Sequence, residues 1–226
     1  MLYPHITKGT FLRRPNRFIA EVETGEGVQV CHVKNTGRCR ELLVPGAAVY
    51  LAYAANPARK TAFDLVAVEK GTRLINMDAQ APNQVFHEWA AGGNFLPDLV
   101  QIHPEYRYGN SRLDFALETG RGLHYVEVKG VTLEENGVVR FPDAPTARGV
   151  KHIQELMEVV RAGGTATLFF VIQMCGVEYF TPNDVTHPEF GQALREAVRA
   201  GVQVAAYDCA VTPDSLVIRA PVPVRL

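Results

Sequence analysis

The sequence predicts two consecutive domains of different class, a small all-β barrel over residues 1–78 and a mixed α/β domain over residues 79–226. In the first part, short apolar segments separated by turn residues follow one another closely, which is typical of a small barrel. Beyond about residue 83, segments with a helical apolar period alternate with segments of strand length. The length of 226 residues is sufficient for a sizeable core.

The N-terminal domain is predicted to contain about five short strands. They are expected in GTFLRRPNRFIAEVET, which bends around Pro15-Asn16, and then in VQVCHVKN, AAVYLAYAA and TAFDLVAVE. A few short strands in so small a segment favour a β-barrel of the OB type. The stretch KGTRLINMDAQAPN, residues 70–83, then breaks the rhythm with polar and turn-forming residues, and it is predicted to be the linker.

The C-terminal domain is predicted to mix helices and strands. Helices are expected at 83–93, 146–164 and 188–200, and strands at 99–107, 112–117, 124–132, 165–174 and 202–208. The helix at 146–164 has the clearest pattern, because its apolar residues form one stripe and Gly163-Gly164 stop it. The segment TATLFFVIQM is continuously apolar, as expected for a strand that is covered on both faces.

Composition indicates an ordinary globular protein of the cytoplasm, with 47% apolar and 21% charged residues. The N-terminus lacks the basic and apolar regions of a signal peptide. The longest apolar run, Leu168–Ile172 with its flanks, is too short to cross a bilayer, so no membrane partner is expected. The four cysteines are scattered without zinc-type spacing, and they are expected to be reduced and buried.

Charge is unevenly distributed although the net charge is only −1. Residues 1–60 hold nine basic and four acidic side chains, whereas residues 81–226 hold 12 basic and 17 acidic ones. This asymmetry indicates a basic module that attracts a polyanion, joined to an acidic module that could hold a metal ion. The alternative is uneven surface charge without a function.

A predicted hairpin in SRLDFALETGRGLHYVEVKG carries the candidate catalytic residues. With a period of two, Leu113, Phe115 and Leu117 share one face of the first strand and Asp114 lies on the other. On the second strand, Glu127 and Lys129 share a face, so both carboxylates and the lysine can converge. Two carboxylates suit Mg²⁺, and a lysine can orient water or stabilise an anionic transition state, so the trio suffices for metal-assisted phosphodiester hydrolysis. The alternative is a solvated, salt-bridged hairpin.

Polar residues that could bind nucleic acid lie in both domains. On the helix at 146–164, an arc of Arg148, Lys151, His152 and Glu155 lies opposite the apolar stripe and could hold phosphates, or could simply be the wet side of the helix. In the N-terminal domain the candidate platforms for base stacking are Phe11, Phe18, Tyr50 and Tyr53, although in so small a barrel such aromatics are more often core residues. The candidate contacts are Arg13, Arg14, Arg17, Asn35, Arg38, Arg40, Arg112, Arg148 and His152.

Four ordered motifs, HVKNTGRCREL, GNSRLDF, YVEVKGVTL and FPDAPTARGVKHIQEL, together resemble the bacterial and archaeal sugar fermentation stimulation protein A family. The resemblance runs nearly from end to end. It implies an N-terminal OB-type domain followed by a restriction-endonuclease-like α/β domain with the PD-(D/E)xK nuclease pattern. By this likeness Asp114 matches the first metal-binding acid, Glu127 the second and Lys129 the catalytic lysine. Lys151 falls where such nucleases often carry a further functional polar residue, and Leu113 replaces the proline of the pattern.

Three functions are open from the sequence. The first is a Mg²⁺- or Mn²⁺-dependent nuclease that acts on single-stranded or duplex DNA, which the complete trio favours. The second is a non-catalytic DNA-binding regulator of sugar metabolism genes, which the family's association with regulation favours. The third is an RNA-binding or RNA-processing protein, because OB folds accept either nucleic acid.

Overall fold

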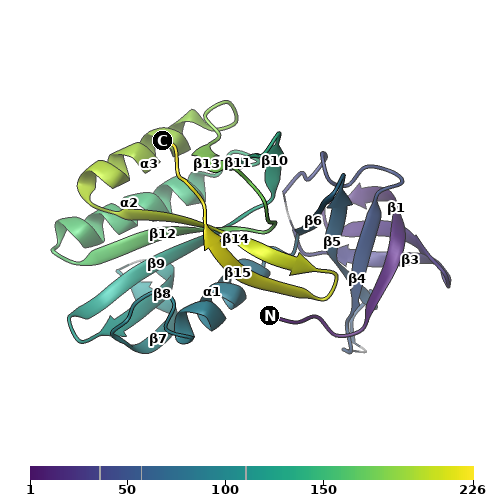
Figure 1. Ribbon diagram of the computed structural model, residues 1–226, viewed down its shortest axis with the longest axis horizontal. Coiled ribbons are helices and arrows are strands. Elements are labelled where there is room, and N and C mark those ends of the chain that lie inside the picture. Colours follow the sequence, from purple (N-terminus) through teal and green to yellow (C-terminus); the bar gives the residue numbers. More distant parts are fainter. Residues whose placement is uncertain (36, 57, 110) are drawn as a thin grey trace.

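The computed structural model describes residues 1–35, 37–56, 58–109 and 111–226, which form a small barrel beside a larger α/β domain (Figure 1). The barrel strands are β1 (Ile6–Asn16), β2 (Ile19–Thr24), β3 (Gly27–Val33), β4 (Ala48–Tyr53) and β5 (Phe63–Lys70). They close in the order β1-β2-β3-β5-β4, because β3 pairs with β5 in parallel and β4 pairs with β1. This closed barrel is of the OB type, as predicted.

A further strand, β6 (Arg73–Asn76), occupies the segment that was predicted to be the linker. It pairs antiparallel with β5 across a turn at Gly71, and Ile75 is fully buried. The linker prediction for residues 70–83 is therefore wrong. The turn-forming residues that suggested a linker instead flank a four-residue strand, and only residues 77–80 separate it from helix α1 (Ala81–Ala91).

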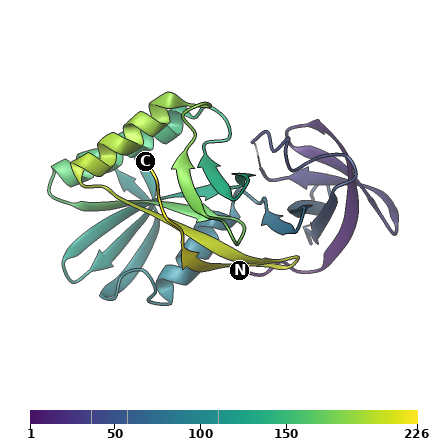
Figure 2. The same ribbon diagram turned by 45° about the horizontal axis from the view of Figure 1, so that its top comes forward.

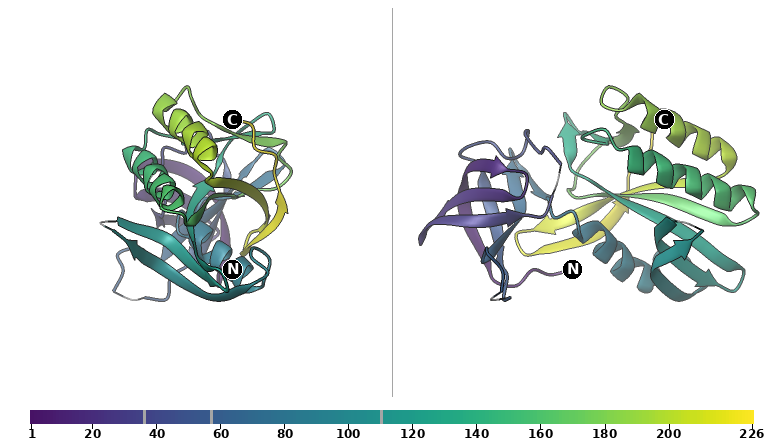
Figure 3. Two further views of the ribbon diagram at one scale, coloured as in Figure 1. Left: turned by 90° about the vertical axis from the view of Figure 1, so that its left-hand side faces the viewer. Right: turned by 180° about the vertical axis from the view of Figure 1, so that it is seen from behind.

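The larger domain is a mixed sheet between helices. Its strands are β7 (Leu99–Tyr108), β8 (Ser111–Thr119), β9 (Gly122–Val131), β12 (Thr165–Ile172), β14 (Gln203–Thr212) and β15 (Ser215–Pro221). They lie in the order β15-β14-β12-β9-β8-β7, with β12 parallel to both β9 and β14. Helix α1 covers one face, and α2 (Ala147–Arg161) and α3 (Pro188–Ala200) cover the other (Figures 1 and 3).

Two apolar clusters on opposite faces hold these layers together. Under α1, the ring of Phe86 packs against Phe115 and Phe169 at centroid distances of 5.2 and 4.8 Å. On the other face, Leu156 of α2 and Phe170 of β12 lie in the second cluster, which continues into the barrel. The continuous apolar run in β12 is thus covered on both faces, as predicted.

Short strands escaped the sequence prediction. A small sheet of β10 (Leu133–Glu135), β11 (Val138–Phe141) and β13 (Tyr179–Pro182) lies beside the main sheet. Elements of three or four residues are too short to display a period of two. The edge strand β15 was missed as well, and Figure 2 shows its hairpin with β14 pointing toward the barrel.

Strand β8 does not keep the simple alternation that the sequence predicted. Phe115 and Leu117 pack in the cluster under α1, whereas Leu113 packs in the cluster with α2 and α3. On the neighbouring strand, Glu105 adopts a φ of 53° between the pairs Pro104–Phe115 and Tyr106–Leu113. The sheet is therefore irregular at the position of Asp114, and the side chains on either side of it face opposite layers.

The two domains are joined by buried polar contacts. Asp78, fully buried at the end of the barrel, lies 2.6 Å from the Lys34 ammonium and accepts a hydrogen bond from Tyr3. Gln173, at the end of β12, donates to Asn76 Oδ1 at 2.8 Å and to the Asp78 carbonyl at 3.0 Å. Buried polar groups with several partners fix geometry, so the barrel is held in one position against the sheet.

In the part of the chain that the structure describes, no helix is long and apolar enough to span a membrane. All four cysteines are free, and Cys31, Cys39 and Cys209 are buried as expected. Cys175 differs from the expectation, because it lies exposed in the turn after β12.

Acid sensitivity is expected from His124, which is buried in β9 between the hydroxyls of Thr165 and Thr167, each 2.9 Å away. Burial lowers the pKa of His124 from 6.5 to about 4. The unfolded chain binds this proton first, so stability should fall by roughly 3 kcal/mol as the pH drops from 6.5 to 4. In urea unfolding across this range, His124→Gln should flatten the pH dependence.

The control for this measurement is His87→Gln, because His87 is exposed on α1. It should keep the wild-type profile. Parallel pH profiles for the wild type and His124→Gln would contradict the assignment of the acid sensitivity to His124.

Candidate active site

Asp114 lies where strands β8 and β9 separate. The pairing of these strands runs from Thr119–Gly122 to Phe115–Val126. Beyond it, Asp114 Oδ2 accepts the Val128 amide at 2.8 Å, in the place of a strand carbonyl. Asp114 Oδ1 accepts from the Asn83 side chain of α1 at 3.0 Å. The carboxylate is therefore fixed between two strands and a helix.

Glu127 is the central buried acid of the site, with 1% of its surface exposed. Its Oε1 accepts hydrogen bonds from the Lys129 ammonium and from His152 Nδ1 on α2. Its Oε2 is buried without a hydrogen-bond partner among the described residues. One oxygen is thus held by two donors, and the other remains able to accept a ligand.

His152 belongs to this buried cluster and not to the exposed arc that the helix pattern predicted. Only 6% of its surface is exposed. Arg148, exposed at the start of α2, donates from Nε to His152 Nε2 at 3.3 Å. This contact places the ring proton on Nδ1, toward Glu127. The sequence pattern missed the contact because it depends on how α2 packs against β9.

The two acids have opposite pKa shifts. Burial and the charge of Glu127 raise the pKa of Asp114. Burial also acts to raise the pKa of Glu127, but the hydrogen bond from His152 and the Lys129 ammonium outweigh it, so its pKa is lowered. A cation bound between these two carboxylates would be stabilising, because it would offset the repulsion between their negative charges.

The donor set fits a hard divalent cation. Asp114 and Glu127 supply carboxylate oxygens, and the buried Glu127 Oε2 has no other partner in the described chain. No group of three or more acidic, histidine or cysteine ligands occurs in the ranges that the structure describes. Mg²⁺ is commonly held by one or two carboxylates, with water and substrate phosphates at its other positions. The residues present therefore fit such an ion.

Lys151 and Arg112 lie outside this cluster. Lys151, 62% exposed on α2, is 3.6 Å from Glu155. It lines a separate hollow that also contains Tyr108 and Ser111. Arg112 is exposed and lies 3.4 Å from Glu105. The structure thus brings Asp114, Glu127, Lys129, Arg148 and His152 together, and does not bring Lys151 or Arg112 to them.

The arginines predicted to contact nucleic acid in the barrel have different environments. Arg14 donates to the carbonyls of Arg17, Asn35, Gly37 and Arg38 at 2.6–3.0 Å, so it holds the loop after β3. Both terminal nitrogens of the guanidinium are thus engaged, and its Nε is buried, so the side chain has little left to offer a phosphate.

The remaining members of this set lie at or near the surface. Arg13 forms a two-pronged ion pair with Glu21, and Arg17 lies over the Phe18 ring at 4.6 Å. Arg38 and Arg40 are exposed. Asn35 caps the loop by accepting the Gly37 amide at 2.8 Å. Arg17, Arg38 and Arg40 are thus the accessible cations among these predicted contacts.

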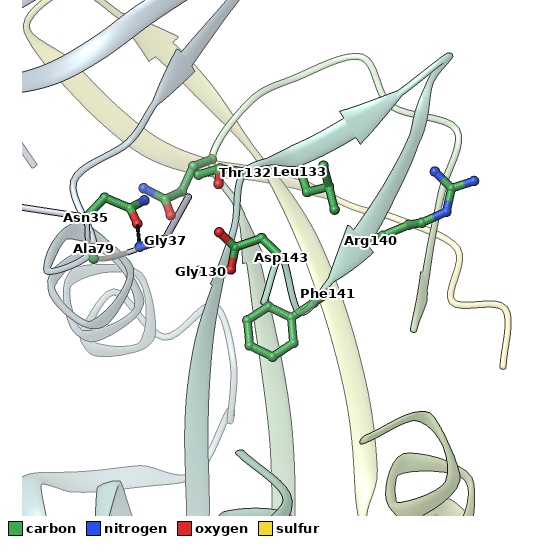
Figure 4. A pocket seen from close by; sticks show the side chains of 10 residues that line it. Asn35, Gly37, Ala79, Gly130, Thr132, Leu133, Arg140, Phe141 and Asp143 are labelled. Carbon is green, nitrogen blue, oxygen red and sulfur yellow. Dashed lines mark hydrogen bonds between the residues drawn. The ribbon is translucent and has the colours of Figure 1, made fainter. Parts of the chain in front are cut away.

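A cavity of about 170 Å³ lies between the two domains (Figure 4). Gly130, which follows Lys129 on β9, forms part of its wall. The barrel contributes Asn35 and Gly37, and the loop before α2 contributes Asp143. A Cβ at Gly37 would lie 2.2 Å from Asp143 Oδ2, so only glycine permits this close approach.

Comparisons with known proteins agree with this architecture. Residues 12–77 match the domain described as "SfsA N-terminal OB domain", and residues 80–215 match "Sugar fermentation stimulation protein RE domain". A sugar fermentation stimulation protein homolog of Ruminiclostridium cellulolyticum is 52% identical over 226 residues, 100% of both chains. A homolog of Desulfitobacterium hafniense is 56% identical over 216 residues, 96% of this chain and 94% of that protein.

A solved structure is similar over the same length. It is the Pyrococcus furiosus SfsA in complex with Ca²⁺, with a TM-score of 0.89 and 29% identity over 100% of this chain and 98% of that chain. The family resemblance and the predicted fold class, an OB-type barrel followed by a restriction-endonuclease-like domain, are confirmed. This chain belongs to the sugar fermentation stimulation protein family.

Proposed function

We propose that this protein is a divalent-metal-dependent nuclease that hydrolyses phosphodiester bonds in DNA. The observation that carries the proposal is the carboxylate pair at the separation of β8 and β9, formed by the half-buried Asp114 and the buried Glu127, whose Oε2 has no partner in the described chain. Lys129 lies beside it in contact with Glu127. A buried acid with a lysine neighbour and an unused oxygen is costly for a purely structural role.

Each residue has a definite task in this proposal. Asp114 and Glu127 hold Mg²⁺ or Mn²⁺, which when bound would supply Lewis-acid activation of water and neutralise charge on the phosphate. Asn83 and the Val128 amide keep Asp114 in position. Lys129 orients the attacking water or stabilises the negative charge that develops on the phosphoryl oxygens. His152 holds Glu127 so that Oε2 faces the cation.

Two further observations support the choice of metal and substrate. The similar protein from Pyrococcus furiosus was solved in complex with Ca²⁺, a cation with the same preference for oxygen ligands as Mg²⁺. The OB-type barrel beside the site belongs to a class of folds that bind nucleic acid strands. Its net positive first sixty residues favour a polyanion.

Divalent cations are expected to raise the unfolding temperature. At a hundredfold excess over the dissociation constant, Mg²⁺ or Mn²⁺ should stabilise the fold by about 2.7 kcal/mol, because the cation relieves the repulsion between Asp114 and Glu127. Differential scanning fluorimetry with added metal against EDTA measures the shift. Glu118→Gln is a matched control, since Glu118 is a partly exposed acid on the same strand.

The nuclease proposal itself is tested by incubation with labelled single-stranded DNA, duplex DNA and RNA, with Mg²⁺, Mn²⁺ or EDTA. Metal-dependent cutting of DNA that disappears in Asp114→Asn supports it. Binding of DNA without cleavage under any metal would leave the DNA-binding regulator as the better account. Cleavage of RNA but not of DNA would show that the substrate of the nuclease is RNA.

A further inference from the structure

The barrel carries a concave site of about 380 Å³ with basic side chains in its walls, here called the basic pocket. Its walls come from the end of β3, from the loop between β4 and β5, and from the segment before α1. The sequence pattern missed it because its members are scattered along the chain. They are His32, Lys34, Arg59, Lys60, Asp64 and Gln80, together with Thr61.

The cations in this site are held in place by one acid. Asp64, with 11% of its side chain exposed, contacts both ends of the Arg59 guanidinium. His32 Nδ1 lies 3.3 Å from the same carboxylate, and Lys34 Nζ lies 3.7 Å away. Burial acts to raise the pKa of Asp64, but Arg59 and Lys34 outweigh it and the pKa is lowered. The carboxylate therefore stays charged and keeps its cations oriented.

The site contains more positively charged side chains than the two nearby acids, Asp64 and Asp78, can neutralise. Lys34 also forms an ion pair with the buried Asp78, so Asp64 and Asp78 together balance two of the cations. Lys60 is exposed, and no acidic side chain in the described chain pairs with it. A basic concavity with a surplus cation favours an anion, and on an OB barrel the loop between the fourth and fifth strands commonly contributes to oligonucleotide binding.

The site lies close to the candidate active site along α1. Gln80 forms part of its wall, and Asn83, three residues later, donates to Asp114 at 3.0 Å. Three residues of helix advance by only about 4.5 Å. Since one strand of DNA advances by about 3.4 Å per nucleotide, both sites can contact one strand within about four nucleotides.

We infer that this basic pocket binds backbone phosphates of the DNA strand that is cleaved, within about four nucleotides of the scissile bond. The inference rests on the proposed function, which identifies the bond that is cleaved. It adds a phosphate-binding site on the barrel, so that both domains contact the substrate strand.

The first experiment measures binding of a fluorescein-labelled single-stranded oligonucleotide in EDTA by anisotropy. Lys60→Ala should weaken binding roughly fivefold, the effect of one charge pair at about 4 Å in water. It should also reduce the slope of log affinity against log salt by about 0.7. Lys60 is exposed, so the variant should fold, whereas Arg59→Ala would also disturb Asp64.

The matched control is Lys8→Ala, because Lys8 is an exposed barrel lysine that pairs with Glu69 at 3.0 Å. It should bind like the wild type. Equal affinity and equal salt slope for Lys60→Ala, Lys8→Ala and the wild type would overturn the inference. An RNA oligonucleotide whose binding depends on Lys60 when DNA binding does not would overturn it as well.

The second experiment locates the contact. Single phosphates of the oligonucleotide are replaced in turn by uncharged methylphosphonates, and affinity is measured in EDTA. In the wild type, one or two positions should weaken binding, and in Lys60→Ala the same positions should have no further effect. Mapping the bond cut with Mg²⁺ should place it within about four nucleotides of those positions.

The two proposals fail in different ways. Sensitive positions that persist unchanged in Lys60→Ala, or a cut more than about four nucleotides away, would overturn the basic pocket while the nuclease remains. Lys60-dependent positions without any cleavage would overturn the nuclease, while phosphate binding at the pocket would be supported.

Discussion

Lys129→Ala is expected to lower kcat for DNA cleavage by about 10²–10³-fold, while DNA affinity changes by no more than a few-fold. The reason is that Lys129 lies within the site, 17% exposed and in contact with Glu127, where it acts on charge that develops only in the transition state. Single-turnover cleavage and anisotropy in EDTA separate the two effects. Both measurements use the same oligonucleotide.

The fold should survive this substitution, because His152 still donates to Glu127. Circular dichroism and the unfolding temperature check this point. Lys8→Ala removes an exposed lysine of the barrel and should cleave at the wild-type rate. A kcat for Lys129→Ala within tenfold of the wild type would exclude a catalytic role for Lys129. A loss of DNA affinity as large as the loss of rate would indicate that Lys129 only helps to bind the DNA.

The trio could be predicted from the sequence because it depends on local structure. Glu127 and Lys129 are two residues apart on one strand, and Asp114 lies on the strand paired with it through a short glycine-rich turn. The period of two places Glu127 and Lys129 on one face, and the hairpin puts Asp114 on the neighbouring strand. The irregularity at Asp114 was not predicted, and the family resemblance assigned the roles of the three residues.

The surroundings of the trio could not be predicted in the same way. His152 is 25 residues from Glu127 in the chain, and its contact depends on the packing of α2 against the sheet. A helix pattern alone placed it on the wet side, whereas the structure buries it. The basic pocket is harder still, because His32, Arg59 and Lys60 meet only when β3 and β5 close the barrel.

The parts of the fold that could not be predicted from the sequence are its short and irregular elements. Strand β6 was hidden between two turns, so the sequence favoured a linker. The irregularity at Asp114 separates Leu113 from Phe115, although a strict alternation would put them on one face. Both differences arise because pairing with distant strands, which no local pattern contains, decides the backbone there.

Removal of the two acids should stop cleavage equally but change stability in opposite directions. Asp114→Asn should leave the metal-free protein as stable as the wild type or more so, because burial and Glu127 make the charge of Asp114 unfavourable. The Asn83 amide can turn to accept from the new side chain. Glu127→Gln should destabilise by roughly 1–3 kcal/mol, because it leaves the Lys129 ammonium in a largely buried site without its counter-charge.

The pH dependence gives the sign of each effect. The pKa of Asp114 is raised in the folded state, so its cost is present at neutral pH and fades as the pH falls through that raised value. The pKa of Glu127 is lowered, so its stabilisation is present above the unfolded value and is lost as the pH falls through the folded one. Any advantage of Asp114→Asn in urea unfolding should therefore shrink in acid, and so should the deficit of Glu127→Gln.

Both variants should also lose the rise in unfolding temperature with Mg²⁺ or Mn²⁺, while Glu118→Gln keeps it. In EDTA, Asp114→Asn should bind DNA somewhat more tightly, because an unneutralised carboxylate repels a nearby phosphate. If both variants retain the metal-induced shift, the cation binds elsewhere. A metal site that needs both acids would lose the metal when either acid is removed. If both variants also bind and cut DNA like the wild type, the carboxylate pair therefore has only a structural role in the sheet.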